Sequence, residues 1–425
     1  MRSFRHRDDP KSVEKLIILK PESTRSASEW TRRQCKITRT DGNRIVSEDT
    51  LWYEFSAGPG NPVVEIAPPD DAEADSYLLA MLFDAMQEGR RIVVQGTVCK
   101  TLLSNLVELQ AAWHKWVPGY RSQPIEVEDA RCPASTTGPS TPGRDTNAIC
   151  AFSGGVDATF SVWRHHRGSA SWRSQSIGAC AIVHGFDIPL ADQGSFDRAL
   201  LRSQRTLDEL AIPLIAIRTN YRQLSRVDWQ HAFASALVAA LGNLKSVAST
   251  CLIGSSEPYD SLVVPLGSSP ITDHLLGSRD FQVIHDGASH SRTEKVAEIS
   301  QWTTGANNLR VCWEGELRDR NCGRCEKCVR TMLNFLVCRQ EIPACFPNDV
   351  DLIDSLKRIR LKNDAVRAEW KQVLDHAKSA GIDARWVQAA KQTLTRRQRL
   401  IRWSSSKPLR TRVSGYAERL FRRRA

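Results

Sequence analysis

A polar corner lies between two apolar runs in the stretch AICAFSGGVDATFSVW. Gly154 and Gly155 carry no side-chain bulk, so backbone N–H groups of this turn can converge on a small volume. Val156 opens the second run, which has helical spacing, and the positive end of a helix dipole would add to a phosphate-binding site. Ser153 can donate its hydroxyl to the same anion. Asp157 can face phosphate only across a cation, so we expect it to hold Mg²⁺.

Four cysteines gather in the segment VCWEGELRDRNCGRCEKCVRTM. Nine residues separate the first two, and two residues separate each later pair. Paired Cys-x-x-Cys steps place thiolates at adjacent corners of a tetrahedron, the arrangement that Zn²⁺ prefers, and four thiolates leave no open position for substrate. We therefore expect a structural Zn²⁺ site, with an iron–sulfur cluster or unligated thiols as alternatives. The expected ligands are Cys312, Cys322, Cys325 and Cys328.

The polar corner resembles the signature Ser-Gly-Gly-x-Asp-Ser of the PP-loop ATP pyrophosphatase superfamily. Residues 153–157 match it, and Ala158 replaces its last serine. The resemblance implies that the loop grips the pyrophosphate of ATP, with Mg²⁺, while a substrate oxygen attacks the α-phosphorus. The missing hydroxyl at Ala158 would remove one phosphate contact. The absence of a Walker A lysine argues against a kinase or GTPase.

A PP-loop followed by a four-cysteine knuckle is similar to the 7-cyano-7-deazaguanine synthase family. The similarity spans about Asn147–Phe346, half of the chain, and is specific only at its two ends. It implies adenylation of a carboxylate and attack by ammonia, with ATP, Mg²⁺ and Zn²⁺ as cofactors. That family has a slightly shorter first cysteine gap and lacks the long N-terminal region and basic tail found here, so its deazapurine substrate does not follow from the resemblance.

Further polar residues follow the later strands. His184 follows the second strand and is either an ATP contact or a hydrogen-bonded loop histidine. Lys295 begins a helix, where it could neutralise charge on the departing pyrophosphate, and similar segments begin the corresponding helix in the resembling family. A polar connection after the fourth strand indicates either a substrate site or a solvated loop. It contains Glu257, Asp260, Ser268, Ser269, Asp273 and His274.

Apolar strands alternating with helices predict an α/β fold with a doubly wound parallel sheet, the PP-loop or HUP-like type. Ligands bind such sheets outside the carboxyl ends of the strands. The expected strands lie at 148–152, 177–186, 212–220, 247–256 and 281–287, and the helices at 196–210, 229–241 and 293–302. Before them, strands are expected at 44–57, 62–69 and 90–98, with an amphipathic helix at 75–89 and another helix at 100–117.

We divide the chain at its compositional changes. The expected parts are an α/β or α+β N-terminal domain at 1–130, a Pro/Gly/Ser/Thr linker at 131–147, the PP-loop domain with its zinc knuckle at 148–346, a helical cap at 347–390 and a basic tail at 391–425. The tail carries twelve lysines and arginines against one glutamate, which accounts for the +11 charge of the whole chain. We interpret it as a solvated tail or as a contact for RNA, an anionic membrane surface or another acidic partner.

The composition fits an ordered protein with reduced thiols. The chain has 425 residues, 41% of them hydrophobic, and its charged N-terminus lacks the apolar block of a secretory signal. We find no apolar window of transmembrane length and expect a cytoplasmic location. We expect an ATP-dependent, AMP-forming enzyme that acts on a small-molecule substrate. The alternatives are an RNA-modifying PP-loop enzyme and a nucleotide-binding module without catalytic activity.

Overall fold

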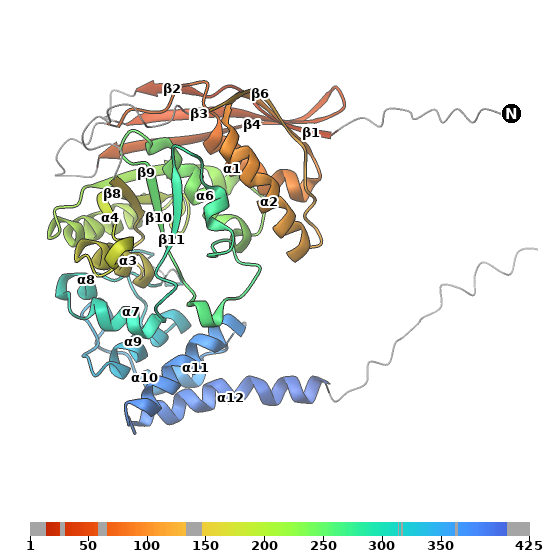
Figure 1. Cartoon of the computed structure of the whole chain (residues 1–425). Helices are drawn as coiled ribbons and strands as arrows, with labels where there is room; N and C mark the ends of the chain where they lie inside the picture. Colours follow the sequence, from red (N-terminus) through yellow and green to blue (C-terminus); the bar gives the residue numbers. More distant parts are fainter. Residues whose placement is uncertain are drawn as a thin grey trace, which may run out of the picture.

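The structure, a computed structural model, describes residues 14–25, 30–57, 66–132, 147–312, 314–315, 318–361 and 364–405. Within these ranges, eleven strands form one mixed sheet, and twelve α-helices accompany it (Figure 1). The chain is therefore an α/β protein, as the sequence predicts. None of the helices in the described ranges is long and apolar enough to cross a membrane.

Five parallel strands form one half of the sheet, in the order β11-β10-β7-β8-β9. Their side chains alternate between two buried faces: Ala148 and Cys150 belong to one hydrophobic cluster, and Ile149 belongs to another. Burial on both faces explains why these strands are nearly continuous apolar runs. All five predicted strands are confirmed, as β7 (Asn147–Ala151), β8 (Ser176–His184), β9 (Leu214–Thr219), β10 (Thr250–Gly254) and β11 (Gln282–Asp286).

Helices cover both faces of this parallel half (Figure 1). Val162 and Phe196 join the cluster of Ala148, whereas Val238 joins the cluster of Ile149. The three helices predicted in this region are confirmed; the one at 229–241 has the predicted ends, and the other two have shifted ends. The helices of this half are α3 (Val156–His166), α4 (Gln193–Asp208), α5 (Tyr221–Leu224), α6 (Trp229–Leu241) and α7 (Arg292–Ile299), with 3₁₀ turns at Ser171–Arg173, Gly242–Leu244, Tyr259–Ser261 and Asp273–Leu276.

The N-terminal strands continue the same sheet. β4 pairs antiparallel with β9, and the strand order then runs β4-β3-β1-β5-β6, with β2 paired to β3. The N-terminal region, expected as a separate domain, thus shares both the sheet and the larger hydrophobic cluster with the parallel half. Its strands are β1 (Glu14–Ile18), β2 (Glu22–Arg25), β3 (Thr31–Asp41), β4 (Arg44–Ala57), β5 (Arg91–Cys99) and β6 (Ile125–Arg131).

Two N-terminal predictions differ from the structure. Residues 66–69, expected as part of a strand, have no regular structure, and residues 62–65 lie outside the described ranges. Pro68 and Pro69 have no N–H to donate to a strand ladder, which explains the difference. The helix expected to be amphipathic, α1 (Asp75–Glu88), is instead buried from Asp75 to Met86 because α6 also packs against it. The other predicted helix is confirmed as α2 (Lys100–Trp116).

The C-terminal region is helical, and it packs around the cysteine segment. Met332 and Trp370, from two of its helices, belong to a third hydrophobic cluster that also contains Cys312 and Cys328. The predicted helical cap is confirmed, and its last helix continues through Ser405, into the basic tail. Residues 406–425 of the tail and 133–146 of the linker lie outside the described ranges. The helices are α8 (Thr303–Asn307), α9 (Glu326–Val337), α10 (Leu352–Arg358), α11 (Asp364–Ser379) and α12 (Arg385–Ser405).

Asn220, which directly follows β9, forms side-chain hydrogen bonds with the backbone of β4. Its side chain accepts a hydrogen bond from the Trp52 amide at 3.0 Å and donates one to the Thr50 carbonyl at 2.8 Å. We expect Asn220→Ala to lower the free energy of unfolding by about 1–3 kcal/mol, because it leaves these backbone groups without their partner. Urea denaturation measures the change, with Gln340→Ala at an exposed position as the control. Equal stabilities of the two variants would contradict this role.

Candidate functional site

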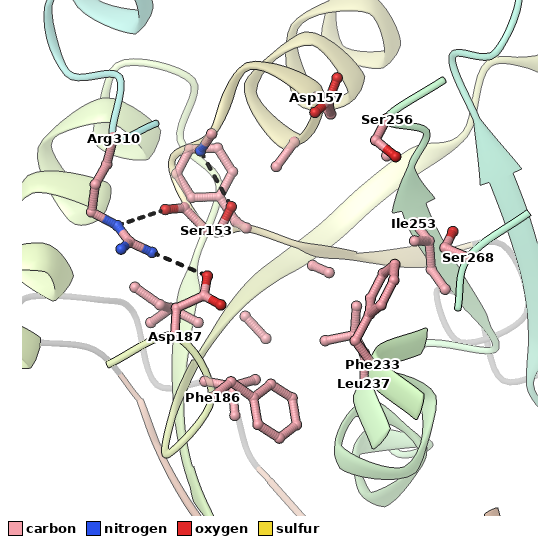
Figure 2. Close-up of a pocket in the computed structure, with 18 of the residues that line it drawn as sticks. Ser153, Asp157, Phe186, Asp187, Phe233, Leu237, Ile253, Ser256, Ser268 and Arg310 are labelled. Carbon is pink, nitrogen blue, oxygen red and sulfur yellow. Dashed lines mark hydrogen bonds and ion pairs between the residues drawn. The ribbon is translucent and has the colours of Figure 1, made fainter. Parts of the chain in front are cut away.

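A pocket of about 310 Å³ lies at the carboxyl ends of β7, β8 and β10 (Figure 2). From β7 the chain adds β8 and β9 on one side of the sheet, and it later adds β10 and β11 on the other side of β7. Ligands of parallel sheets bind at such a switch point. The apolar wall includes Phe233 and Leu237 of α6, Phe186 after β8 and Ile253 of β10. The polar side chains that line the pocket are Ser153, Asp157, Asp187, Gln230, Ser256, Ser268, Arg310 and Lys327.

The loop between β7 and α3 forms one polar end of the pocket. Gly154 has a φ of +75°, a left-handed conformation that side chains disfavour, and this places its carbonyl toward the Arg310 amide, 2.7 Å away. The Gly155 amide donates to the Ser153 hydroxyl at 3.3 Å, and α3 begins at the next residue. Ser153 and Gly155, two of the residues expected to bind ATP, line the pocket.

Arg310 forms hydrogen bonds with this loop. Its Nε donates to the Ser153 carbonyl at 3.1 Å, and its guanidinium lies 3.9 Å from the Asp187 carboxylate (Figure 2). Burial lowers the pKa of Arg310, and the Asp187 carboxylate opposes that shift. The guanidinium nevertheless stays protonated at neutral pH, as arginine does in proteins. A positive charge is therefore fixed where the sequence predicts phosphate.

Lys327 adds a second positive charge to the lining of the pocket. It lies in the first turn of α9, between Cys325 and Cys328. Burial, with contributions from Arg292 and Arg330, lowers its pKa to about 8. Neither Lys327 nor Arg310 was predicted from the sequence as a pocket residue. The available signal was their position beside expected metal ligands, since Arg310 precedes Cys312 by two residues.

Asp157 is paired with two cations. Its carboxylate oxygens lie 3.1 Å from Lys295 Nζ and 3.1 Å from an Arg292 nitrogen. Burial raises the pKa of Asp157, but the charges of Lys295 and Arg292 outweigh this effect and hold it below its usual value. Lys295 is only 1% exposed and also donates to the Ser255 carbonyl. Asp157 lines the pocket, whereas Lys295 is not among the described lining residues.

Val156 and His184 are not among the described residues that line the pocket, although chain neighbours of both are. Val156 is fully buried in the C-terminal hydrophobic cluster. The His184 ring stacks on Phe196 with its centroid 4.3 Å away, and its Nε2 lies 2.9 Å from the Pro189 carbonyl oxygen. Burial lowers the pKa of His184. The structure thus corresponds to the hydrogen-bonded alternative for this histidine.

The polar connection after β10 contributes to the other end of the pocket. Ser256 and Ser268 line it (Figure 2). The Ser268 hydroxyl donates to the buried Asp273 carboxylate at 2.7 Å, and that carboxylate also contacts His285 Nδ1 at 2.7 Å. Ser268 Oγ also lies 3.3 Å from His285 Nδ1, so Asp273 and His285 together hold this side chain in the pocket lining. Of the residues expected in this connection, Ser268 lies in the described pocket lining, and the substrate site stays a prediction.

The four predicted metal ligands lie together. Their sulfur atoms fall within 4.8 Å of one another, and the separations from Cys312 to Cys322 and to Cys325 are both 3.5 Å. The Cys322–Cys328 separation is 3.9 Å. Zinc–sulfur bonds near 2.3 Å require sulfur–sulfur edges of about 3.8 Å in a tetrahedron, so the thiols fit this ion. These separations exceed the roughly 2.05 Å of a disulfide. The cluster can therefore hold a metal ion such as Zn²⁺.

Backbone groups and neighbouring helices hold the thiols in place. The Cys325 amide donates to the Cys322 sulfur at 3.3 Å. Glu326, at the start of α9, accepts from the Trp370 indole at 2.6 Å and pairs with Arg330 at 2.8 Å. The cluster is thus joined to α11 as well as to the pocket.

Comparisons with protein-family models, with curated proteins and with solved structures found no match to this chain. The resemblance to PP-loop enzymes rests on the Ser153–Asp157 loop and the four cysteines. Function is therefore inferred from the residues of the pocket and of the cysteine cluster.

We expect the purified protein to contain about one zinc per chain, because four thiolates satisfy a tetrahedral ion. Cys325→Ser should lower both the zinc content and the melting temperature, since structural zinc stabilises small domains strongly. Elemental analysis and thermal unfolding measure the two effects. Cys338→Ser, outside the cluster, is the control and should change neither. A brown protein with acid-labile sulfide would contradict the zinc assignment.

Gly254, the last residue of β10, leaves room for the first turn of α3. A Cβ at this position would lie 2.8 Å from the Asp157 carbonyl atoms and 3.1 Å from the Ala158 nitrogen. We expect Gly254→Ala to lower the free energy of unfolding by about 1–3 kcal/mol, because backbone must shift to admit the methyl group. The control is Gly119→Ala, where a Cβ meets nothing within 4 Å. Urea denaturation compares them, and a fully stable Gly254→Ala would contradict this close contact.

Proposed function

We propose that the chain is an ATP-dependent, AMP-forming enzyme that adenylates a small-molecule carboxylate or amide oxygen. The observation that carries this proposal is a single pocket that combines an apolar wall with a loop and two cations suited to phosphate. Phe186, Phe233 and Leu237 offer apolar surface for a nucleoside. Ser153, Arg310 and Lys327 offer donors and positive charge for phosphate groups.

The proposed chemistry follows from the placement of these charges. A substrate oxygen forms a bond to the α-phosphorus, and the bond from that phosphorus to the bridging oxygen breaks, so pyrophosphate leaves with the electron pair. Arg310 and Lys327 stabilise the negative charge that develops on pyrophosphate. Ammonia or another nucleophile then attacks the activated carbon and displaces AMP. The family resemblance adds the doubly wound PP-loop fold to this proposal.

Mg²⁺ would accompany the nucleotide and screen its phosphates. Asp157 and Asp187 are the carboxylates of the described pocket lining that could bind it. Asp157 is held by Lys295 and Arg292, so it would give up part of this pairing to bind the ion. The longer contact of Asp187, 3.9 Å from Arg310, leaves that carboxylate more available. Zn²⁺ in the cysteine cluster would have a structural role.

The pairing of Asp157 favours a second candidate function. A carboxylate neutralised by Lys295 and Arg292 is a weak ligand for Mg²⁺, and Ala158 lacks the hydroxyl of the family signature. A nucleotide-binding module without turnover would need neither group. This candidate predicts ATP binding without release of pyrophosphate.

Incubation of the full-length protein with Mg²⁺, radiolabelled ATP and a deproteinised metabolite extract tests the proposal. We expect labelled AMP and pyrophosphate in equal amounts, and Asp157→Asn should lower their formation at least tenfold because it removes a charge that orients Lys295 and Arg292. The exposed Asp197→Asn is the control. ADP with phosphate as the products would contradict the proposal. ATP binding without any product would favour the second candidate, and no ATP binding would exclude both.

A further inference from the structure

The two cations of the pocket belong to the same chain segments as the cysteine ligands. Arg310 precedes Cys312 by two residues, and Lys327 directly precedes Cys328. Both cations line the pocket, whereas the four sulfur atoms are grouped next to it in a separate cluster. Each segment therefore faces the pocket with one residue and the cluster with another.

We propose that the cysteine cluster controls anion binding in the pocket: metal bound by the four thiols fixes Arg310 and Lys327 as a paired site for the phosphate groups of a nucleotide. The choice of a nucleotide rests on the proposed function. The linkage itself rests on the shared segments and applies to any phosphate-bearing ligand, including free pyrophosphate. Lys327 is thereby assigned as a binding residue, and the metal site as the element that positions it.

The first connection runs through Arg310. Its amide donates to the Gly154 carbonyl at 2.7 Å and its Nε donates to the Ser153 carbonyl at 3.1 Å, so its segment is bonded to the loop. The next residue, Val311, donates to the Asn321 side chain at 2.8 Å, and Cys312 follows. The segment 310–312 thus connects the Ser153–Gly154 loop to the cysteine cluster. Release of Cys312 would free one end of it.

The second connection runs through the start of α9. Cys325 caps this helix and Cys328 lies in its first turn, so a metal bound to both fixes the rotation of that turn. Lys327 lies between them and lines the pocket. The preceding Cys-x-x-Cys step also has a cation before its second cysteine, Arg324, but that side chain is 71% exposed and pairs with Asp349 at the surface. The two steps direct one cation into the pocket and the other to solvent.

A linkage of this kind is reciprocal. If metal raises the affinity for a phosphate ligand by some factor, the ligand must raise the affinity for metal by the same factor. Couplings between two sites typically amount to about 5–150-fold. The positioning role therefore has a readout at the cluster itself, independent of turnover.

The test compares the zinc-loaded and zinc-free full-length protein in calorimetric titrations with ATP in Mg²⁺ buffer. We expect zinc removal to weaken ATP binding at least tenfold. Lys327→Met should weaken binding to the zinc-loaded protein by about the same factor while its zinc content stays unchanged, and Lys327→Arg should restore part of the affinity. Arg324→Met, the matched control, should bind like the unmodified protein. If zinc-loaded Lys327→Met binds ATP as tightly as zinc-loaded Arg324→Met, the proposal is overturned. This comparison does not need the zinc-free protein, so it remains valid if that protein unfolds.

Cobalt substitution tests the reciprocal effect. The thiolate-to-cobalt absorbance reports how much metal the cluster retains at equilibrium with a competing chelator. ATP should increase retention in the unmodified protein and in Arg324→Met but not in Lys327→Met. Equal retention in all three proteins would overturn the linkage.

Pyrophosphate, titrated in the same way, separates this proposal from the proposed function. Metal-dependent binding of pyrophosphate without binding of ATP would contradict the proposed function and support the linkage. Binding of both ligands independently of metal would contradict the linkage alone.

Discussion

The hydrogen bonds between Arg310 and the Ser153–Gly154 loop connect the parts of this site. A buried guanidinium needs partners, and here the partners are backbone carbonyls of the loop and of Arg318, together with the Asp187 carboxylate. The same residue therefore shapes the loop, charges the pocket and anchors the segment that leads to Cys312. Removal of this contact would separate the polar end of the pocket from the cysteine cluster.

The sequence predicts the parallel half of the fold well because burial on both faces produces unbroken apolar runs, as in β7 and β10. It does not reveal β3, whose sequence TRRQCKITRTD is rich in charge. Arg33 of this strand is nevertheless buried and donates to Asn243 in the parallel half at 3.0 Å. Such a compensating partner lies 210 residues away in the chain, so no local pattern predicts it.

In the site, too, features formed by neighbours in the chain were predicted, whereas contacts between distant segments were not. Ser153, Gly155 and the four cysteines follow from spacing, because turns and metal knuckles are formed by neighbours in the chain. The salt bridges of Asp157 join α3 to α7 and depend on how those helices pack, so its pairing could not be read from the sequence. His184 looks like a ligand contact from its position at the carboxyl end of β8, yet its ring stacks on Phe196.

The pairing of β4 with β9 also has a consequence for how the protein can be divided. Residues Tyr53–Ala57 cover the backbone of Thr219–Ile215, which would otherwise be an exposed sheet edge. Unpaired strand edges recruit other chains and promote aggregation. A fragment that begins at the first parallel strand would expose β9 along with the apolar surface that α1 covers. We therefore expect the pocket-bearing half to stay dispersed only when the N-terminal region covers this edge.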